Sequence, residues 1–327
     1  MKIAGYQYQS CFGSYIEQFV HEKKEAGFIY ESEEWLLKHF DVFCFQKGIS
    51  EPLISKELVA EWGTLKDNEE MVTCSKRISV VRQLGLYMIS LGMEAYTPNR
   101  FYKAAKKVVH IFSDEEIISV FKVIDEYVPA VSGVSFHRLA VEYKAIFRLI
   151  YCCGLRISEA RNLCNDDVDL KHGTIRILHS KGHKDRVVYL ADDLTELLRE
   201  YSLILSSVFH CQSVWFFPAR ESEKQLSTVT IGKRFRESWA KTPFAENCDR
   251  NPTVHCLRHS FVVKRMNMWM EEGVSLKEML PFLSKYLGHT SPDETFYYYH
   301  QIDSAFRIIR CRDKSSVKVI PEVPSDE

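Results

Sequence analysis

The chain has 327 residues, of which 46% are hydrophobic and 27% charged, so it is expected to form two soluble globular domains rather than a disordered chain. No apolar run is long enough to span a bilayer and the N-terminus lacks the pattern of a signal peptide, which predicts a cytoplasmic protein. The 10 cysteines include no CxxC pair, which argues against a zinc knuckle or a disulfide framework. A net charge of -1 counts mildly against a dedicated DNA-binding protein, which is usually more basic because neutralised phosphates supply most of its affinity.

Residues 1–105 are predicted to form a small all-helical domain. Four stretches carry apolar residues at helical spacing, and glycines close three of them. No strand-like alternation interrupts this part of the chain. The predicted helices span residues 14–27, 32–48, 54–62 and 73–93.

Basic residues gather toward the end of this domain. Taken singly, most of them are better read as an ordinary solvated face. As a group they could line a DNA backbone, with the positive charge concentrated on one side. The candidate DNA-binding residues are Lys76, Arg77, Arg82, Arg100, Lys103, Lys106 and Lys107. The rising Lys/Arg density after Pro98 places a linker at residues 106–112.

Residues 113–315 are predicted to form a second domain, followed by a flexible tail at 316–327. Ser113 and the acidic residues after it are typical of a helix N-terminus. Short β-type runs joined by turns follow Asn165 and predict a small antiparallel sheet within a mainly helical domain. Helices return at residues 191–205 and 226–241, and Pro281 is expected to break the helical final third.

Two basic residues in this domain have both a functional and an ordinary interpretation. Arg156 follows a glycine bend and could direct its planar guanidinium at a phosphate, with Glu159 fixing it. Alone, the pair would be better read as a surface i,i+3 ion pair. Lys181 lies in the turn SKGHKDR between two strands, where it could donate a proton or serve as solvated decoration.

A second group of candidates lies in the stretch from His255 to His300. His255 and Arg258 are three residues apart and share one helix face, while His289 and Tyr298 follow downstream. His255 and His259 do not match the HExxH pattern of zinc proteases, so no metal site is predicted and His259 is expected to be structural. Alone, the tyrosine run would be read as core or interface aromatics.

The motifs GLRxSE, KGxKxR, HxLRH and LGH occur in this order, with a tyrosine nine residues after the last histidine. In this combination the chain resembles the tyrosine recombinase (phage integrase) family, which includes Xer-type recombinases and mobile-element integrases. The resemblance implies a helical core-binding domain joined to an α+β catalytic domain. It also implies DNA integration or transposition chemistry on double-stranded DNA at a specific site, with no cofactor.

The resemblance assigns a role to each candidate. Tyr298 would attack a DNA phosphate to form a 3′-phosphotyrosyl link, Lys181 would protonate the leaving 5′-oxygen, and His255 would assist proton removal from the tyrosine. Because a phenol has a pKa of about 10, it needs cations nearby to attack as phenolate.

The remaining three roles concern the phosphate. The family pattern implies that Arg156 and Arg258 clamp its non-bridging oxygens, that His289 hydrogen-bonds it, and that Glu159 is the supporting carboxylate.

Three functions fit this pattern. The first is a site-specific recombinase that acts as a homotetramer on DNA. An accessory protein could set the direction of its reaction. The second is a monomeric DNA-relaxing enzyme of the type IB topoisomerase kind, and the third a non-catalytic DNA-binding protein of the same fold. Because every expected catalytic residue type is present, the third ranks last.

Overall fold

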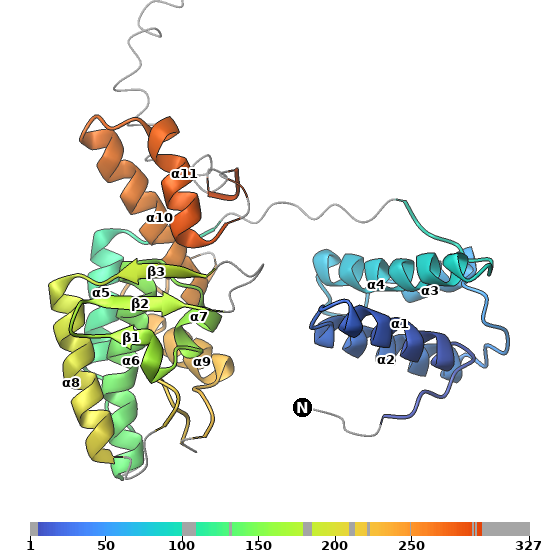
Figure 1. Cartoon of the computed structure of the whole chain (residues 1–327), viewed down its shortest axis with the longest axis horizontal. Helices are drawn as coiled ribbons and strands as arrows, with labels where there is room; N and C mark the ends of the chain where they lie inside the picture. The colour runs from blue at the N-terminus through green and yellow to red at the C-terminus, as the bar shows by residue number, and fades with distance from the viewer. Residues whose placement is uncertain are drawn as a thin grey trace, which may run out of the picture. The chain divides into compact units, whose positions relative to one another are not determined.

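The computed structural model describes residues 6–99, 109–130, 133–178, 185–208, 213–220, 223–248, 250–289, 291 and 293–295. The chain divides into two compact units, Met1–Lys107 and Val108–Glu327 (Figure 1). This division falls inside the segment predicted to be a linker.

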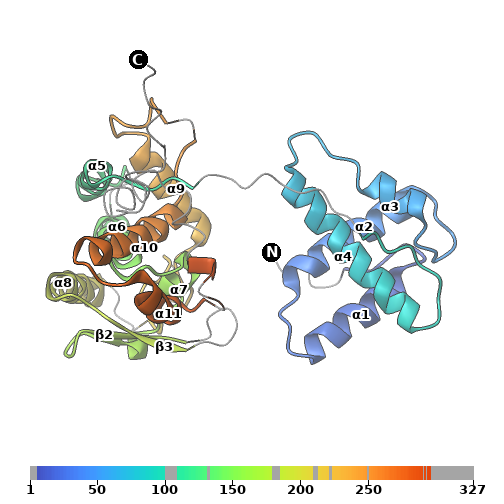
Figure 2. The same cartoon turned by 90° about the horizontal axis from the view of Figure 1, so that it is seen from above.

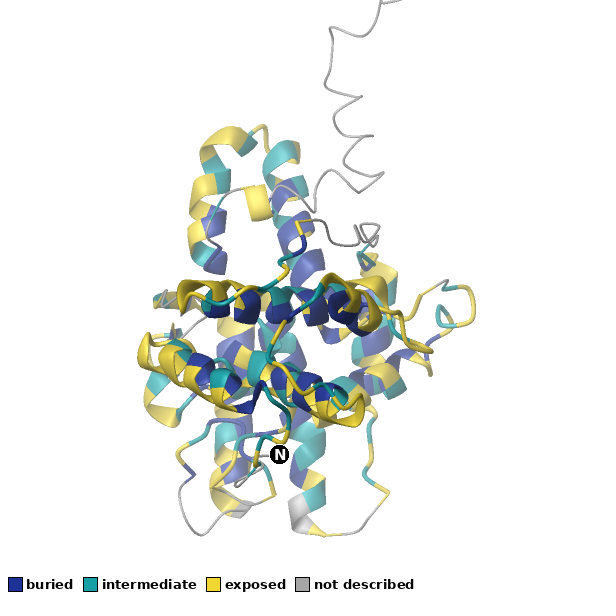
Figure 3. Cartoon of the chain, turned by 90° about the vertical axis from the view of Figure 1, so that its right-hand side faces the viewer, coloured by how far each residue is buried: buried dark blue, intermediate teal, exposed yellow. Residues whose placement is uncertain are grey.

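In its described residues the first unit is helical, as expected, apart from an isolated bridge between Ile54 and Ala95. Its helices are α1 (Gly13–Glu25), α2 (Glu31–Gln46), α3 (Lys56–Trp62) and α4 (Met71–Ser90). Their buried positions face the interior of the unit (Figure 3). The core formed there includes Ile16, Phe40, Trp62 and Leu84.

The second unit combines helices with a small sheet. Its helices are α5 (Asp114–Asp125), α6 (Val134–Cys153), α7 (Ile157–Arg161), the 3-10 turn η1 (Asn165–Asp167), α8 (Asp192–Val208), α9 (Thr228–Trp239), α10 (Val254–Glu271) and α11 (Leu276–Leu287). Its strands are β1 (Val168–Asp169), β2 (Thr174–Ile177) and β3 (Arg186–Tyr189). The mainly α fold with a small antiparallel sheet is therefore confirmed.

The sheet is antiparallel in the order β1-β2-β3. Ile175 pairs with Val188, and both side chains are fully buried against the helices. Ile177 pairs with Arg186, the first residue of β3. Residues 179–184, which include Lys181 and join β2 to β3, lie outside the described residues.

Helix α6 lies at the centre of this unit and packs against α5, α8 and α10 (Figures 1 and 2). The predicted cap of α5 is present: Oγ of Ser113 accepts a hydrogen bond from the Glu116 backbone N–H, and the Glu116 carboxylate accepts one from Ser113 N. The preceding residue belongs to the core, because Phe112 is buried and its N–H donates to Oγ of Ser260 on α10 (2.9 Å). The final residues of the predicted 106–112 linker are therefore part of the second unit.

The expectation that Pro281 breaks the chain's last helical part is wrong. Pro281 lies inside α11, which continues to Leu287. The missing N–H costs one hydrogen bond, but Leu283 and Leu287 bury their side chains in a cluster with Val262 and Met266 of α10. No helix in the described part of the chain is long and apolar enough to cross a membrane.

Candidate active site

A glycine turn presents Arg156 to the site. Helix α6 ends at Gly154, whose φ of 61° is left-handed, and a Cβ there would lie 2.5 Å from the ring of Phe261. The chain then turns into α7, which Arg156 precedes as the N-cap residue. The Arg156 N–H donates to Oε2 of Glu159 (2.9 Å). The GLR motif thus fixes the backbone conformation at Arg156, from which its guanidinium group extends.

Three arginine side chains lie around the carboxylate of Glu159. Nη1 of Arg156 lies 2.7 Å from Oε1, and Arg186 donates to both oxygens at 3.2 and 2.8 Å. Nη1 of Arg258 is 3.7 Å from Oε2. Burial alone would raise the pKa of Glu159, but the hydrogen bonds and charges of Arg186 and Arg156 hold it below the ordinary value. Because Glu159 is buried, the alternative of a solvated surface pair does not apply.

Arg258 connects two helix ends from its place on α10. Its Nη1 donates to the carbonyl of Gly154 (2.7 Å) and its Nη2 to that of Leu287 (2.8 Å). Arg156 also reaches the end of α11, where Nη2 lies 3.4 Å from the carbonyl of Gly288. Since helix C-terminal carbonyls carry partial negative charge, both guanidinium groups are held in a favourable field.

His289 follows the left-handed Gly288 that ends α11 and is buried. Its Nε2 lies 2.9 Å from Nη2 of Arg258, and its Nδ1 lies 2.7 Å from Oγ1 of Thr295. A guanidinium can only donate, so Nε2 accepts and the neutral ring carries its proton on Nδ1. Burial, followed by the charges of Arg258 and Arg156, lowers the pKa of His289 to about 4.

His255 lies on the same helix as Arg258. Enclosure by the protein and the charges of Arg258 and Arg156 lower its pKa to about 4, although the residue retains solvent exposure. Its ring packs edge-on against that of His259, with centroids 4.3 Å apart. His259 is buried, and burial lowers its pKa to about 3. His259 is thus part of the packed interior of the second unit, and the role of His255 in the site stays a prediction.

The structure thus brings Arg156, Glu159, Arg258 and His289 together through successive contacts, and His255 lies on the same helix as Arg258, near enough to feel its charge. Six of the predicted site residues lie outside the described residues: Lys181, Tyr298, Arg100, Lys103, Lys106 and Lys107.

Two contributors were not predicted from the sequence. Arg186 is the last residue of the motif KGxKxR, and this motif is the feature of the sequence that could have indicated its role. A single arginine at the end of a strand is otherwise usually solvated. Thr295 is fully buried and accepts from His289, and six residues separate the two in sequence. A threonine at that distance carries no signal of its own.

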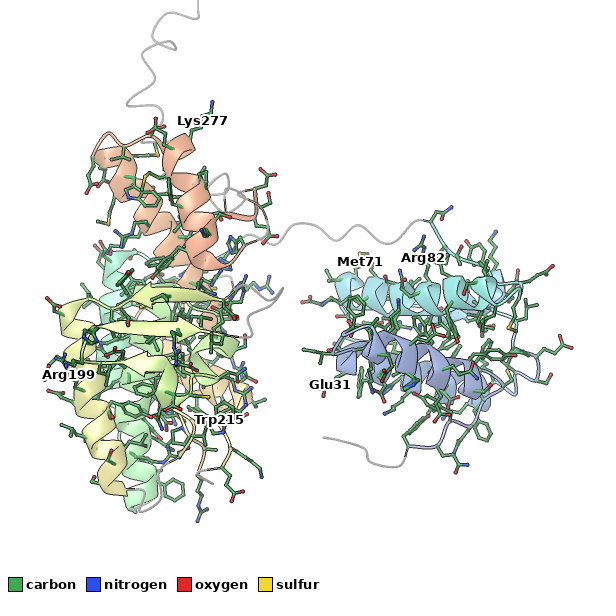
Figure 4. All side chains as sticks on the ribbon, in the orientation of Figure 1. Glu31, Met71, Arg82, Arg199, Trp215 and Lys277 are labelled. Carbon is green, nitrogen blue, oxygen red and sulfur yellow. The ribbon has the colours of Figure 1, made fainter. Side chains whose placement is uncertain are left out.

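The three described basic candidates of the first unit have different environments. Lys76 is exposed on α4, and Arg82 donates from Nε to the carbonyl of Pro98 (3.1 Å; Figure 4). Both remain expectations for DNA contact. Arg77 requires a correction.

Arg77 is 4% exposed, so it has no surface to offer a DNA phosphate. Its guanidinium pairs with Glu69 at 2.7 Å and donates to the carbonyls of Trp62 and Thr64. It also lies over the Trp62 ring, 4.7 Å from the centroid. Arg77 therefore joins the segment after α3 to α4.

Comparison with known proteins agrees with this geometry. The phage integrase family model matches residues 115–304, more than half of the chain. The tyrosine recombinase XerC of Chlorobaculum parvum is 28% identical over 69% of this chain and 68% of its own length. XerC of Chlorobaculum tepidum is 31% identical over 48% of this chain and 44% of its own length. The chain spans about half the length of three curated relatives that are at least 30% identical to it.

Solved structures show the same fold. The XerH site-specific recombinase bound to its difH substrate, in a post-cleavage complex, aligns with a TM-score of 0.63 at 20% identity, covering 93% of this chain and 84% of that one. A lambda integrase dimer bound to a core site aligns with a TM-score of 0.61 at 14% identity, covering 96% and 99%. By sequence and fold, the chain belongs to the phage integrase family of tyrosine recombinases.

Proposed function

We propose that this protein is a site-specific DNA recombinase that cuts and rejoins DNA through a covalent bond between Tyr298 and a 3′-phosphate. The observation that carries the proposal is the convergence of Arg156 and Arg258 on the buried carboxylate of Glu159, with His289 bonded to Arg258. These residues come from distant parts of the chain. Such a cluster of donors fits a phosphodiester whose charge increases in the transition state.

The two arginines would neutralise the non-bridging oxygens of the phosphate. Arg156 keeps 22% of its side chain exposed and can turn N–H groups toward DNA while Glu159 holds Nη1. Arg258 is buried and would contribute chiefly through its fixed charge and through Nη2, which already lies beside His289. Lys181, placed on the β2–β3 hairpin, would protonate the departing 5′-oxygen.

Of the two histidines, one would accept a proton and the other would hydrogen-bond the phosphate. With a pKa lowered to about 4, His255 is neutral at pH 7 and can accept the proton of Tyr298. Nε2 of His289 accepts from Arg258 in the DNA-free protein. To donate to a phosphate this nitrogen must gain a proton, which the negative charge of DNA favours.

The proposed partner is double-stranded DNA at a specific site, bound by a homotetramer. A lambda integrase tetramer bound to a Holliday junction aligns with a TM-score of 0.58, which supports the assembly by fold alone. The reaction would require neither metal nor ATP, because protein cations supply the field and each phosphodiester is exchanged for an ester of similar energy. The chain's Lys76 and Arg82 would contact the DNA backbone.

The test uses nicked suicide duplexes that tile the DNA on both sides of the gene. Covalent protein–DNA adducts are resolved on denaturing gels. The wild type should form an adduct with one duplex. Tyr298→Phe should bind that duplex but form none, and Arg156→Ala should slow adduct formation by about 10²-fold or more. Arg199, which pairs with Glu196 on the surface of α8, offers a control as Arg199→Ala (Figure 4).

Absence of any adduct across the tiled duplexes would contradict the proposal. Relaxation of supercoiled plasmid by dilute monomer, without dependence on a site, would favour the DNA-relaxing alternative instead.

A further inference from the structure

Arg186 is bound to the carboxylate that holds Arg156. Its two terminal nitrogens lie 3.2 and 2.8 Å from the two oxygens of Glu159, which is the fork geometry of a bidentate pair. The Nε of Arg186 is buried and has no hydrogen-bond partner among the described residues. Within that part of the chain, its guanidinium therefore depends on Glu159 for hydrogen bonds.

The burial of the two arginines separates their roles. The Arg186 side chain is 8% exposed, whereas that of Arg156 is 22% exposed. Glu159 is thus approached from the protein interior by Arg186 and from the open side by Arg156. Because a charged carboxylate loses its hydration on burial, the inner fork is what keeps Glu159 ionised and in a fixed orientation. An ionised, oriented Glu159 can in turn hold Arg156.

Arg186 also connects two other parts of the site. It is the first residue of β3, directly after the end of the hairpin that carries Lys181. On its other side it abuts the turn before His289, since a Cβ on Gly288 would lie 3.0 Å from Nη1 of Arg186. One side chain at the start of β3 thus touches both Glu159 and the end of α11.

We propose that Arg186 is a positioning residue, which acts through Glu159 to hold Arg156 in place. Arg186 itself would not touch the DNA phosphate. This inference rests on the proposed function for its kinetic consequence, but its effect on Glu159 is independent of any activity.

The kinetic experiment measures single-turnover adduct formation on the cleaved duplex for the wild type, Arg186→Gln, Arg186→Lys, Glu159→Gln and the double variant Arg186→Gln/Glu159→Gln. Arg186→Gln should slow adduct formation by roughly 10-fold or more with DNA affinity unchanged within about two-fold. Arg186→Lys retains the charge but not the fork, and should recover part of the loss. Arg199→Gln is the matched control on the surface.

Two features of the data would distinguish positioning through Glu159 from a general structural role. In the Glu159→Gln background, removal of Arg186 should cost less than about two-fold, because both changes break the same contact. The reduction in the rate of adduct formation caused by Arg186→Gln should also become larger as the pH falls toward about 5. Without Arg186, the carboxylate of Glu159 takes up a proton more readily.

A second measurement reads the same contact without DNA. The thermal midpoint difference between wild type and Arg186→Gln should be largest near neutral pH and shrink as Glu159 protonates in acid. In the Glu159→Gln background that pH dependence should vanish. If the wild type forms no adduct, the proposed function fails, and this measurement still decides the inference.

The inference is overturned by an Arg186→Gln adduct rate within about two-fold of wild type, or by full additivity with Glu159→Gln. A pH-independent midpoint difference would overturn it as well.

Discussion

Nη2 of Arg258 lies 2.9 Å from Nε2 of His289, and Nδ1 of the same ring lies 2.7 Å from Oγ1 of Thr295. The buried chain Arg258–His289–Thr295 determines which nitrogen of the imidazole carries the proton. The orientation of the proposed phosphate-binding histidine is therefore set by a hydroxyl that follows it by six residues.

Replacing this hydroxyl tests that relationship. Thr295→Val leaves the Nδ1–H of His289 without its acceptor, at a cost of about 1–3 kcal/mol in the free energy of unfolding. Adduct formation should fall several-fold because the hydroxyl no longer orients the ring through Nδ1. The control is Thr242→Val, which removes another buried hydroxyl, bonded to the carbonyl of Trp239 (2.8 Å). Equal adduct rates for the two variants would contradict the role of Thr295.

The lowered pKa of His289 predicts a dependence of stability on pH. Its pKa is about 4 in the folded protein, against an ordinary histidine value of 6.5, so between these values the unfolded chain binds more protons. Stability should therefore decrease as the pH falls from about 6.5 toward 4. His289→Asn should show a shallower decrease in the thermal midpoint over that range. Parallel curves for the two proteins would contradict a buried, neutral His289.

Gly288 tests the crowding around Arg186. Its φ of 67° already disfavours alanine, and the added Cβ would meet Nη1 of Arg186 at 3.0 Å. Gly273, with φ 81° and nothing within 4 Å of its Cβ, shares the backbone strain without the contact. Each alanine should cost about 1–2 kcal/mol of folding stability, but Gly288→Ala alone should slow adduct formation. Equal effects on the adduct would show that the contact has no role.

The first unit offers a paired test of structural and DNA-binding cations. Arg77→Met removes the buried partner of Glu69 and should lower folding stability by about 3–5 kcal/mol. Lys76→Ala changes an exposed residue, so the thermal midpoint should hold while DNA affinity at low salt drops a few-fold. A thermal scan and a binding titration on each variant separate the two effects. A stable Arg77→Met protein would contradict the structural assignment of Arg77.

The features that the sequence predicted correctly are those that depend on residues close together in the chain. The Ser113 cap, the glycines that end helices and the alternating strands are short-range features, and the structure reproduces them. The motif order also pointed to the residues that meet around Glu159.

Tertiary contacts account for what could not be predicted. Arg77 and Lys76 are adjacent in sequence, and only the packing of Trp62 and Glu69 makes the first a buried residue. Arg186 gained its role from a carboxylate 27 residues away. Pro281 remained in its helix because α10 supplies a partner for the leucines around it.

The most direct test of the central claim is the identity of the amino acid joined to DNA. The adduct formed on a suicide duplex is digested with nuclease and protease, and the modified peptide is sequenced by mass spectrometry. We expect a nucleotide 3′-phosphate on Tyr298, absent in Tyr298→Phe and slow to form in Arg156→Ala. Attachment at Tyr297 or Tyr299, or at a serine, would contradict it.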